Sequence, residues 1–271
     1  MNLQEIKKYL SRKIAPKVFR LDSDIYGLQY DKKKSDRLIR KVVLTMDLSL
    51  EMIYFAVKNK IGLIIANNSL IHNPINKFNF ILINKLSLLS KYPISIYVLS
   101  SSFIGAEGGI SDTLVRALYF KLECLFEIKN KVGINIPIGR ICSPLKYVDK
   151  NHIITLEDIL NRIKTNLNMK AISYIGDLNK PIKKICVVGG DNSKISFITK
   201  AVKFGCDCYI SGKINYGEGI FARDIGINLI EISTYKKGIL TLKKLCNILS
   251  LEFPHVEFFL FESKDPFKTY F

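Results

Sequence analysis

The segment KVVLTMDLSLEMIYFAVKNKIGLIIANN, residues 41–68, decides the fold. The apolar, β-branched run at 41–47 is typical of a buried strand. Ser49 then opens a stretch whose apolar residues recur at helical spacing, and a second apolar strand follows at 61–68. A strand, a helix and a strand in this order predict parallel strands joined by a right-handed crossover.

The same alternation continues along the chain. We expect helices at 2–14, 78–90, 156–167, 194–205 and 240–250, one after Gly108–Gly109 and a helical turn at 217–225. Strands are expected at 94–101, 171–176, 184–190, 206–212, 227–233 and 256–262, with an irregular stretch at 126–155. This pattern predicts an α/β protein with two α/β domains and mixed, mainly parallel sheets. The first domain is predicted to comprise 1–125 plus 233–271, and the second 126–232.

Composition limits the class of protein. The 271 residues are 48% hydrophobic and 11% aromatic, which favours a globular chain over a disordered one. No segment has the roughly 18 uninterrupted apolar residues that a membrane span needs, and the N-terminus lacks the apolar core of a secretory signal. The six scattered cysteines are then expected to be reduced core thiols. These features predict a cytoplasmic protein without a membrane partner.

Net charge is the most informative part of the composition. Lysine and arginine number 41 and aspartate and glutamate 24, which gives +17. Such an excess favours a polyanionic partner, although a coding bias toward lysine would also produce it. The densest cluster, flanked by Tyr26 and Tyr30, predicts a nucleic-acid patch for RNA or ribonucleoprotein at Lys32, Lys33, Lys34, Arg37, Arg40 and Lys41. Segments 11–20 and 179–184 carry further basic residues.

Several short motifs, in order, resemble those of the Nif-three-like family (NGG-interacting-factor-three-like, also known as type-two GTP cyclohydrolase homologues). They are APKVFRLDSDIYGLQY (15–30), VVLTMDLSLEMIYFAV (42–57), EGGISDTL (107–114), GRIC (139–142), KKICVVGGDNSK (183–194), GCDCYISGKINYGEG (205–219) and GINLIEISTYKKG (226–238). Together they span nearly the whole chain. The resemblance implies two α/β domains, assembly into rings as large as hexamers, and a pair of divalent metals between the domains.

The resemblance also implies where the metal ligands belong, and this chain departs from the family there. Family members carry a His-His pair, an aspartate before the Gly-Gly turn, and a histidine and a glutamate around a tyrosine. Imidazole and carboxylate groups suit a catalytic metal pair. The corresponding positions here, which we interpret as former metal-site positions, are occupied by Asn67, Asn68, Ile104, Thr234 and Gly238. We therefore predict a pseudoenzyme with no metal, no cofactor and no catalytic residue.

Lysines near those positions suggest what replaced the metal. We predict an anion-binding, phosphate-accepting cleft between the domains, formed by Lys213, Lys236, Lys237, Ser211 and Gly212. The alternative is that these lysines are ordinary solvated surface chains. Asp47, beside the first crossover, is expected to cap the following helix rather than act as a lone general base.

Three functions are consistent with the sequence. The first is a basic binding protein that docks on RNA or ribonucleoprotein, the ribosome included. The second is an enzyme of the dimetal hydrolase or GTP cyclohydrolase type that acts on a small nucleotide or phosphorylated substrate. The third is an oligomeric scaffold, a dimer to a hexamer.

Overall fold

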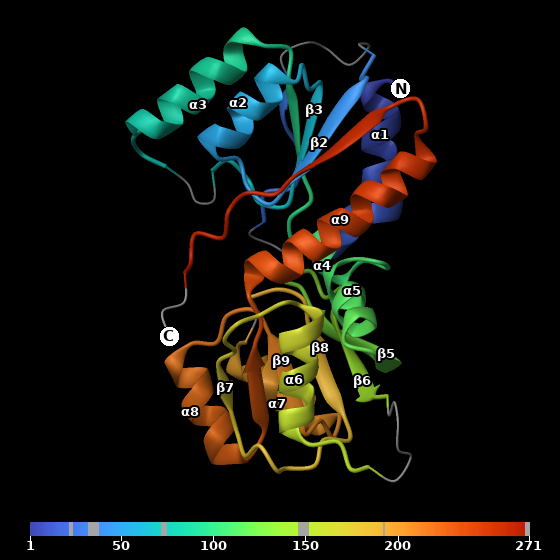
Figure 1. Cartoon of the computed structure of the whole chain (residues 1–271), viewed down its shortest axis with the longest axis vertical. Helices are drawn as coiled ribbons and strands as arrows, with labels where there is room; N and C mark the ends of the chain where they lie inside the picture. Colours follow the sequence, from blue (N-terminus) through green and yellow to red (C-terminus); the bar gives the residue numbers. More distant parts are fainter. Residues whose placement is uncertain (22–23, 32–37, 72–74, 146–151, 192, 269–271) are drawn as a thin grey trace. The chain divides into compact units, whose positions relative to one another are not determined.

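The chain forms two compact units, each with its own sheet (Figure 1). The computed structural model describes residues 1–21, 24–31, 38–71, 75–145, 152–191 and 193–268. The first unit contains Met1–Phe103 and Thr241–Pro266, and the second contains Ile104–Leu240 together with the chain from Phe267. Two α/β units with mixed sheets confirm the predicted fold class.

The sheet of the first unit has the order β1-β4-β3-β2-β11. Its strands are β1 (Gly27–Asp31), β2 (Lys41–Thr45), β3 (Leu63–Ala66), β4 (Ser95–Val98) and β11 (Glu257–Phe261). The pairs β11–β2, β2–β3 and β3–β4 are parallel, whereas β1 is antiparallel to β4. The mainly parallel arrangement predicted from residues 41–68 is confirmed for this sheet.

Polar residues begin the helices of this unit. Ser49 accepts the backbone N–H of Met52 at 3.1 Å and starts α2 (Leu50–Lys58). Asn79 caps α3 (Phe80–Lys91), and Asn2 forms a capping box in α1 (Leu3–Tyr9), which continues as a wider turn over Leu10–Ile14. The prediction that Asp47 caps α2 is wrong, because Ser49 lies one residue before the helix and takes that place.

The apolar face of α2 packs on the sheet. Met52, Ile53 and Ala56 are fully buried against Val43 and Ile64. Burying each large aliphatic side chain contributes roughly 1.5–3 kcal/mol. This core holds the strand ends of the first unit in place.

The sheet of the second unit has the order β5-β6-β8-β9-β10-β7. Its strands are β5 (Phe120–Lys129), β6 (Asn135–Pro144), β7 (Tyr174–Ile175), β8 (Ile185–Val188), β9 (Cys208–Ser211) and β10 (Asn228–Glu231). Only the neighbours β8–β9 and β9–β10 are parallel among its described pairs. This sheet is therefore mixed but not mainly parallel. Its helices are α5 (Ile110–Ala117), α6 (Leu156–Asn166), α7 (Ile195–Lys203) and α8 (Tyr216–Ile225).

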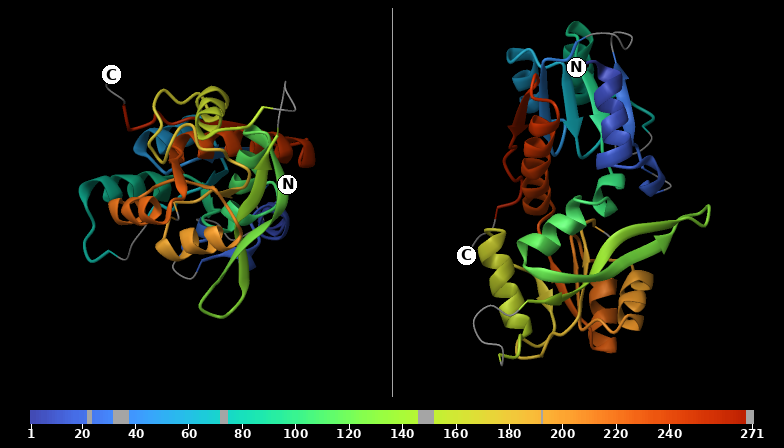
Figure 2. Two further views of the ribbon diagram at one scale, coloured as in Figure 1. Left: turned by 90° about the horizontal axis from the view of Figure 1, so that it is seen from below. Right: turned by 90° about the vertical axis from the view of Figure 1, so that its right-hand side faces the viewer.

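A long hairpin replaces much of the irregular stretch predicted at 126–155. Strands β5 and β6 pair antiparallel and extend beyond the rest of the sheet (Figure 2). At its tip, Asn130 Oδ1 accepts the N–H groups of Val132 and Ile134 at 3.1 and 2.9 Å, and Gly133 has φ +85°. The side chain of Asn130 thus closes the turn, and the left-handed backbone at Gly133 favours glycine.

The unit boundaries at 103/104 and 240/241 differ from those predicted at 125/126 and 232/233. Helix α5 belongs to the second unit because it packs on β5, β6 and β8. A Cβ on Gly189, just after β8, would come 2.7 Å from the backbone nitrogen of Ser111 in α5. Boundary residues Phe103 and Leu240 lie inside helices, α4 (Ser102–Gly105) and α9 (Thr234–Glu252).

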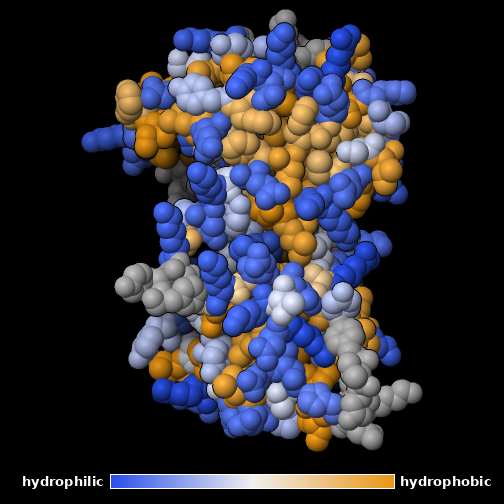
Figure 3. Space-filling view, in the orientation of Figure 1, coloured by the Kyte–Doolittle hydropathy of each residue, from blue (hydrophilic) through white to orange (hydrophobic). Residues whose placement is uncertain are grey.

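No helix in the described parts of the chain is long and apolar enough to cross a membrane. Hydrophilic side chains are spread over the face shown in Figure 3, with apolar side chains between them.

Candidate functional site

The parallel strands of the second unit bring three polar segments together. In α/β sheets, ligands bind beyond the carboxyl ends of parallel strands. At those ends lie Gly189–Asp191 after β8, Gly212–Lys213 after β9, and Ser233 with the first turn of α9 after β10.

An ion pair forms the centre of this site. Lys237 Nζ lies 2.8 Å from Asp191 Oδ1, and Thr234 Oγ1 donates to the same oxygen at 2.7 Å. The side chain of Lys237 is 3% exposed and that of Asp191 44%. The sequence motif GGDNSK contained Asp191, but its partnership with Lys237 was not predicted. The position of Asp191 directly after a parallel strand was the sequence signal that could have indicated its place in the site.

Each partner shifts the pKa of the other. Burial lowers the pKa of Lys237, and the charge of Asp191, its hydrogen bond and the charge of Glu231 oppose that effect. Burial would raise the pKa of Asp191, but the charge and hydrogen bond of Lys237, the hydrogen bond of Thr234 and the charge of Lys213 together lower it. The attraction between the two groups therefore favours the ionised form of the pair.

Gly212 makes room for this pair. A Cβ at position 212 would lie 1.8 Å from Asp191 Oδ1 and 2.1 Å from Lys237 Nζ. The N–H of Gly212 donates to the carbonyl of Gly190 at 3.0 Å, and the hydroxyl of Ser211 donates to the same oxygen at 3.1 Å. The predicted anion donors Ser211 and Gly212 thus already have protein acceptors, and Lys237 is engaged with Asp191.

The two remaining lysines of the predicted anion site differ in exposure. Lys213 is exposed, and its carbonyl accepts the hydroxyl of Ser193 at 2.6 Å. Lys236 is half-buried in the first turn of α9, where its N–H donates to Ser233 Oγ at 3.3 Å. The five residues of the predicted anion site all lie in the second unit.

The five positions that the sequence analysis interpreted as former metal-site positions are divided between the units. Asn67 and Asn68 follow β3 in the first unit, and Ile104, Thr234 and Gly238 belong to the second. Asn67 Nδ2 donates to Asn68 Oδ1 at 3.0 Å. The buried Asn67 Oδ1 accepts no hydrogen bond from the described residues. The two amides thus satisfy only part of their hydrogen-bonding capacity with each other.

The donors at these positions do not fit the metal pair that the family resemblance implies. Amides, an isoleucine, a threonine and a glycine supply neither imidazole nor carboxylate. In the described part of the chain, no group of three or more histidine, cysteine, aspartate or glutamate side chains could hold a metal. His152 contacts Asp158 at 2.9 Å, His255 is exposed, and His72 lies outside the described residues.

Buried thiols offer no ready nucleophile. Cys142, Cys186, Cys206 and Cys208 are buried and free, whereas Cys124 is exposed. Burial raises the pKa of Cys142 and that of Cys206 to about 12. These two side chains are therefore protonated at neutral pH, and the thiol form is a poor nucleophile.

Two motif residues, Asp112 and Arg140, are structural. Arg140 is 2% exposed, and its Nε lies 2.5 Å from Asp112 Oδ1. Its remaining nitrogens donate to backbone carbonyls, including those of Gly105 and Gly139, each at 2.9 Å. Asp112 Oδ2 also accepts the N–H of Gly108 at 2.7 Å. The Gly-Gly turn and the GRIC strand thus meet in a satisfied buried ion pair rather than at a ligand site.

The predicted nucleic-acid patch lies largely outside the described residues, since Lys32, Lys33, Lys34 and Arg37 fall there. Arg40 is exposed, whereas Lys41 pairs with Glu257 at 3.2 Å. In the basic segment 179–184, Lys180 donates to the carbonyl of Gly226 and Lys184 pairs with Glu123 at 3.4 Å. Arg12, Lys13 and Lys17 in segment 11–20 are exposed.

The chain is thus a two-unit α/β protein. Each unit carries a polar cluster where its parallel strands end. Comparison with known proteins identifies the family. The chain belongs to the Duf34/NIF3 (NGG1p interacting factor 3) family, whose profile matches residues 1–266.

Relatives and solved structures agree with this assignment. A Clostridium perfringens protein named "GTP cyclohydrolase 1 type 2 homolog" is 29% identical over 259 residues, covering 94% of this chain and 95% of that protein. The Bacillus cereus protein related to NIF3 superposes with a TM-score of 0.83 at 18% identity, covering 100% of this chain and 99% of that one. Reduced HcgD from Methanocaldococcus jannaschii gives 0.79 at 22% identity, covering 97% and 98%. These structures establish the shared fold.

Proposed function

We propose that this protein is a metal-independent, non-catalytic member of its family that binds RNA or ribonucleoprotein in the cytoplasm, the ribosome being one candidate. The observation that carries the proposal is the ion pair between the buried Lys237 and Asp191. The cation beside the polar strand ends of the second unit is the ammonium group of Lys237. The five positions that resemble metal-ligand positions carry no imidazole or carboxylate.

Charge supports a polyanionic partner. The net charge of +17 is accompanied by exposed cations that have no carboxylate within ion-pair distance among the described residues, such as Arg12, Lys13, Lys17 and Lys213. Because Lys237 neutralises Asp191, Lys213 adds uncompensated positive charge beside the pair. We propose Lys213 and Lys236 as the side chains that meet a phosphate group, since ammonium groups bind phosphate as mobile point charges.

Salt dependence tests the proposal. Binding to ribosomal RNA should weaken as salt rises, with log K falling linearly against log[salt]. Replacing Arg12, Lys13 and Lys17 by glutamine should reduce that slope by about 0.7–0.9 for each phosphate that the protein no longer neutralises. The control replaces the exposed Lys164, Lys170 and Lys203 by glutamine, which removes the same charge elsewhere. Salt-insensitive binding, or none, contradicts the proposal.

The name of the relatives, "GTP cyclohydrolase 1 type 2 homolog", favours a second function, an enzyme acting on a nucleotide or phosphorylated substrate. The family resemblance implies that such an enzyme would use metal. Elemental analysis of the native protein separates the two. A metal-independent protein contains substoichiometric zinc, iron and manganese, and its melting temperature is unchanged when these ions are added, because only a ligand of the folded state raises it. Stoichiometric metal would favour the enzyme.

Exposed apolar side chains favour a third function, an oligomeric scaffold. Phe80, Ile81 and Ile83 of α3 are 75%, 56% and 50% exposed. Contiguous apolar surface often marks a protein interface. Light scattering distinguishes this option, since a monomer at all accessible concentrations excludes a ring.

A further inference from the structure

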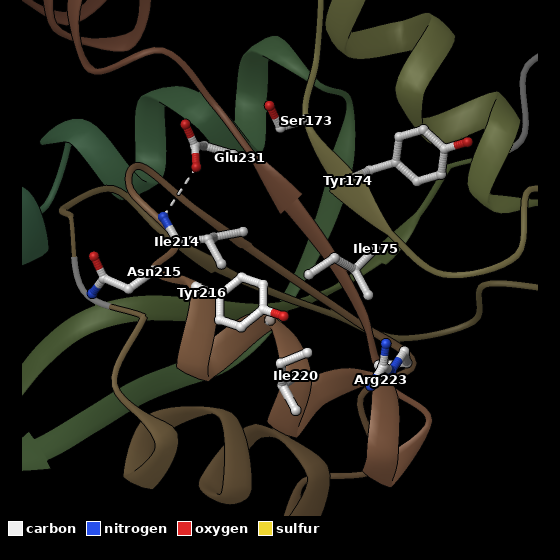
Figure 4. A pocket seen from close by; sticks show the side chains of 10 residues that line it. Ser173, Tyr174, Ile175, Ile214, Asn215, Tyr216, Ile220, Arg223 and Glu231 are labelled. Carbon is white, nitrogen blue, oxygen red and sulfur yellow. Dashed lines mark hydrogen bonds between the residues drawn. The ribbon is translucent and has the colours of Figure 1, made fainter.

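A pocket of about 380 Å³ lies in the second unit, next to the predicted anion site, because Ile214, which follows Lys213, lines it. Strand β7, the connection from β9 to α8, helix α8 and the end of β10 surround it (Figure 4). Its volume falls in the range of small-molecule sites.

One wall of the pocket is apolar. Ile175, Ile214 and Ile220 line it, with the ring of Tyr216 beside them (Figure 4). A Cβ on Gly219 would come 2.9 Å from Ile175 Cδ1, so the glycine lets α8 approach β7 closely. Tyr216 is 86% exposed, and a large aromatic ring so exposed is available to stack on a flat ligand.

Opposite charges stand at the two ends of this wall (Figure 4). At one end, Glu231 Oε2 accepts the N–H of Ile214 at 3.1 Å, which fixes the carboxylate and leaves Oε1 as an acceptor. At the other end is Arg223, whose side chain is 67% exposed and whose nearest carboxylate, Asp224, is 3.7 Å away. An exposed pair of that length holds the guanidinium weakly.

We propose that this pocket binds a nucleotide. An amino group on the base would donate to Glu231, the base would stack on Tyr216 against the isoleucines, and the phosphate would accept from Arg223. Carboxylates accept from base amino groups, and aromatic rings stack on any base. A guanidinium can bind phosphate through two parallel hydrogen bonds. Tyr174 directs its ring away from this wall and takes no part (Figure 4).

The carboxylate sets a preference among bases. Adenine, cytosine and guanine present an exocyclic amino group, whereas the single N–H on the pairing edge of uracil lies between two carbonyl oxygens that repel a carboxylate. The pocket should therefore bind AMP, CMP and GMP more tightly than UMP. This proposal goes beyond RNA docking through the basic surface, because it concerns one nucleotide in a defined pocket.

The chain contains no tryptophan, so the fluorescence of a single introduced tryptophan can report ligand binding. Tyr216→Trp places a single tryptophan in the pocket of the full-length protein and keeps a stacking surface. Titration with AMP, CMP, GMP and UMP should quench its fluorescence saturably, with UMP binding weakest. In the same background, Arg223→Gln should weaken AMP binding about tenfold, as expected for loss of a charge-assisted hydrogen bond. Lys203→Gln, which removes the same charge from an exposed position on α7, should not.

A single-stranded RNA octamer of mixed sequence distinguishes the sources of the nucleotide. If the natural ligand is a unit of RNA, the octamer binds more tightly than AMP, and AMP competes with it. If it is a free nucleotide, AMP binds and the octamer does not. No saturable quenching by any of these ligands overturns the proposal, as does quenching that Arg223→Gln leaves unchanged. If the Arg223→Gln variant still binds ribosomal RNA in a salt-sensitive way, the proposed docking function stands even when the nucleotide pocket is overturned.

Discussion

Lys237 Nζ and Asp191 Oδ1 form a 2.8 Å ion pair between two side chains of unequal burial, 3% and 44% exposed. Water can hydrate the carboxylate when its partner is removed, but it cannot reach the ammonium. The two halves of the pair are therefore not equivalent.

Removing the carboxylate should be the more harmful change. Asp191→Asn leaves a buried ammonium without its nearest counter-ion, and we expect it to lower the free energy of unfolding by about 3 kcal/mol. Lys237→Met exchanges a buried charge for an apolar chain of similar length, which is often neutral, so we expect less than about 1 kcal/mol. Urea unfolding followed by tyrosine fluorescence measures both. Equal losses of stability in the two variants would show that the difference in burial between Lys237 and Asp191 does not matter.

The contribution of Asp191 should depend on pH. Its pKa in the folded protein lies below the ordinary value of 3.8, so its stabilising effect is present above that value and is lost as pH falls through the lower, folded pKa. The stability advantage of the wild type over Asp191→Asn should be constant near neutrality and disappear in acid. Urea unfolding of both proteins between pH 7 and the acid limit of folding tests this. An advantage that grows in acid would reverse the expected sign.

Gly212→Ala should displace the ion pair. The added Cβ would overlap Asp191 Oδ1 and Lys237 Nζ, and we expect a loss of about 1–3 kcal/mol, as for overpacking. The loss should shrink in the Lys237→Met background, since contacting sites couple. Gly217→Ala is the matched control, because nothing lies within 4 Å of its Cβ position. An unchanged free energy of unfolding in Gly212→Ala would contradict the close packing of Gly212 against the ion pair.

Arg140→Lys should destabilise the second unit although it keeps the charge. The guanidinium reaches Asp112 and several carbonyls at once, including those of Gly105 and Gly139. An ammonium cannot satisfy them all, and each buried acceptor left unpaired costs about 1–3 kcal/mol. We expect a loss of about 2–4 kcal/mol by urea unfolding. A smaller loss would indicate that water replaces the missing donors.

Strong periodicity made the first unit predictable. Residues 41–68 combine two apolar runs with a helix that begins at Ser49, so local pattern and tertiary packing agree there. The hairpin at 120–144 was missed because residues 121–125 are exposed on an edge strand, which removes the alternation between buried and exposed residues. The turn residues Asn130 and Gly133, between runs rich in isoleucine and phenylalanine, were the signal available.

The candidate site was harder to predict than the fold. Lys237 was selected for its charge, but its carboxylate partner lies 46 residues away, and sequence spacing alone does not reveal such a pairing. Likewise, nothing in the sequence indicates that Gly212 lies under the pair. Helix α9 begins at Thr234 rather than Leu240, and this places Lys236 and Lys237 on successive positions of a helix, one half-buried and one buried.

The buried ammonium of Lys237 also disfavours metal binding at Asp191. A divalent ion arriving at Asp191 would meet a carboxylate already matched by Lys237 and would be repelled by that lysine. Placing histidine at position 234 and glutamate at position 238 would therefore not by itself create a metal centre beside Asp191. Lys237 would have to be replaced as well, so we expect no single substitution among these three positions to raise the affinity for a divalent metal.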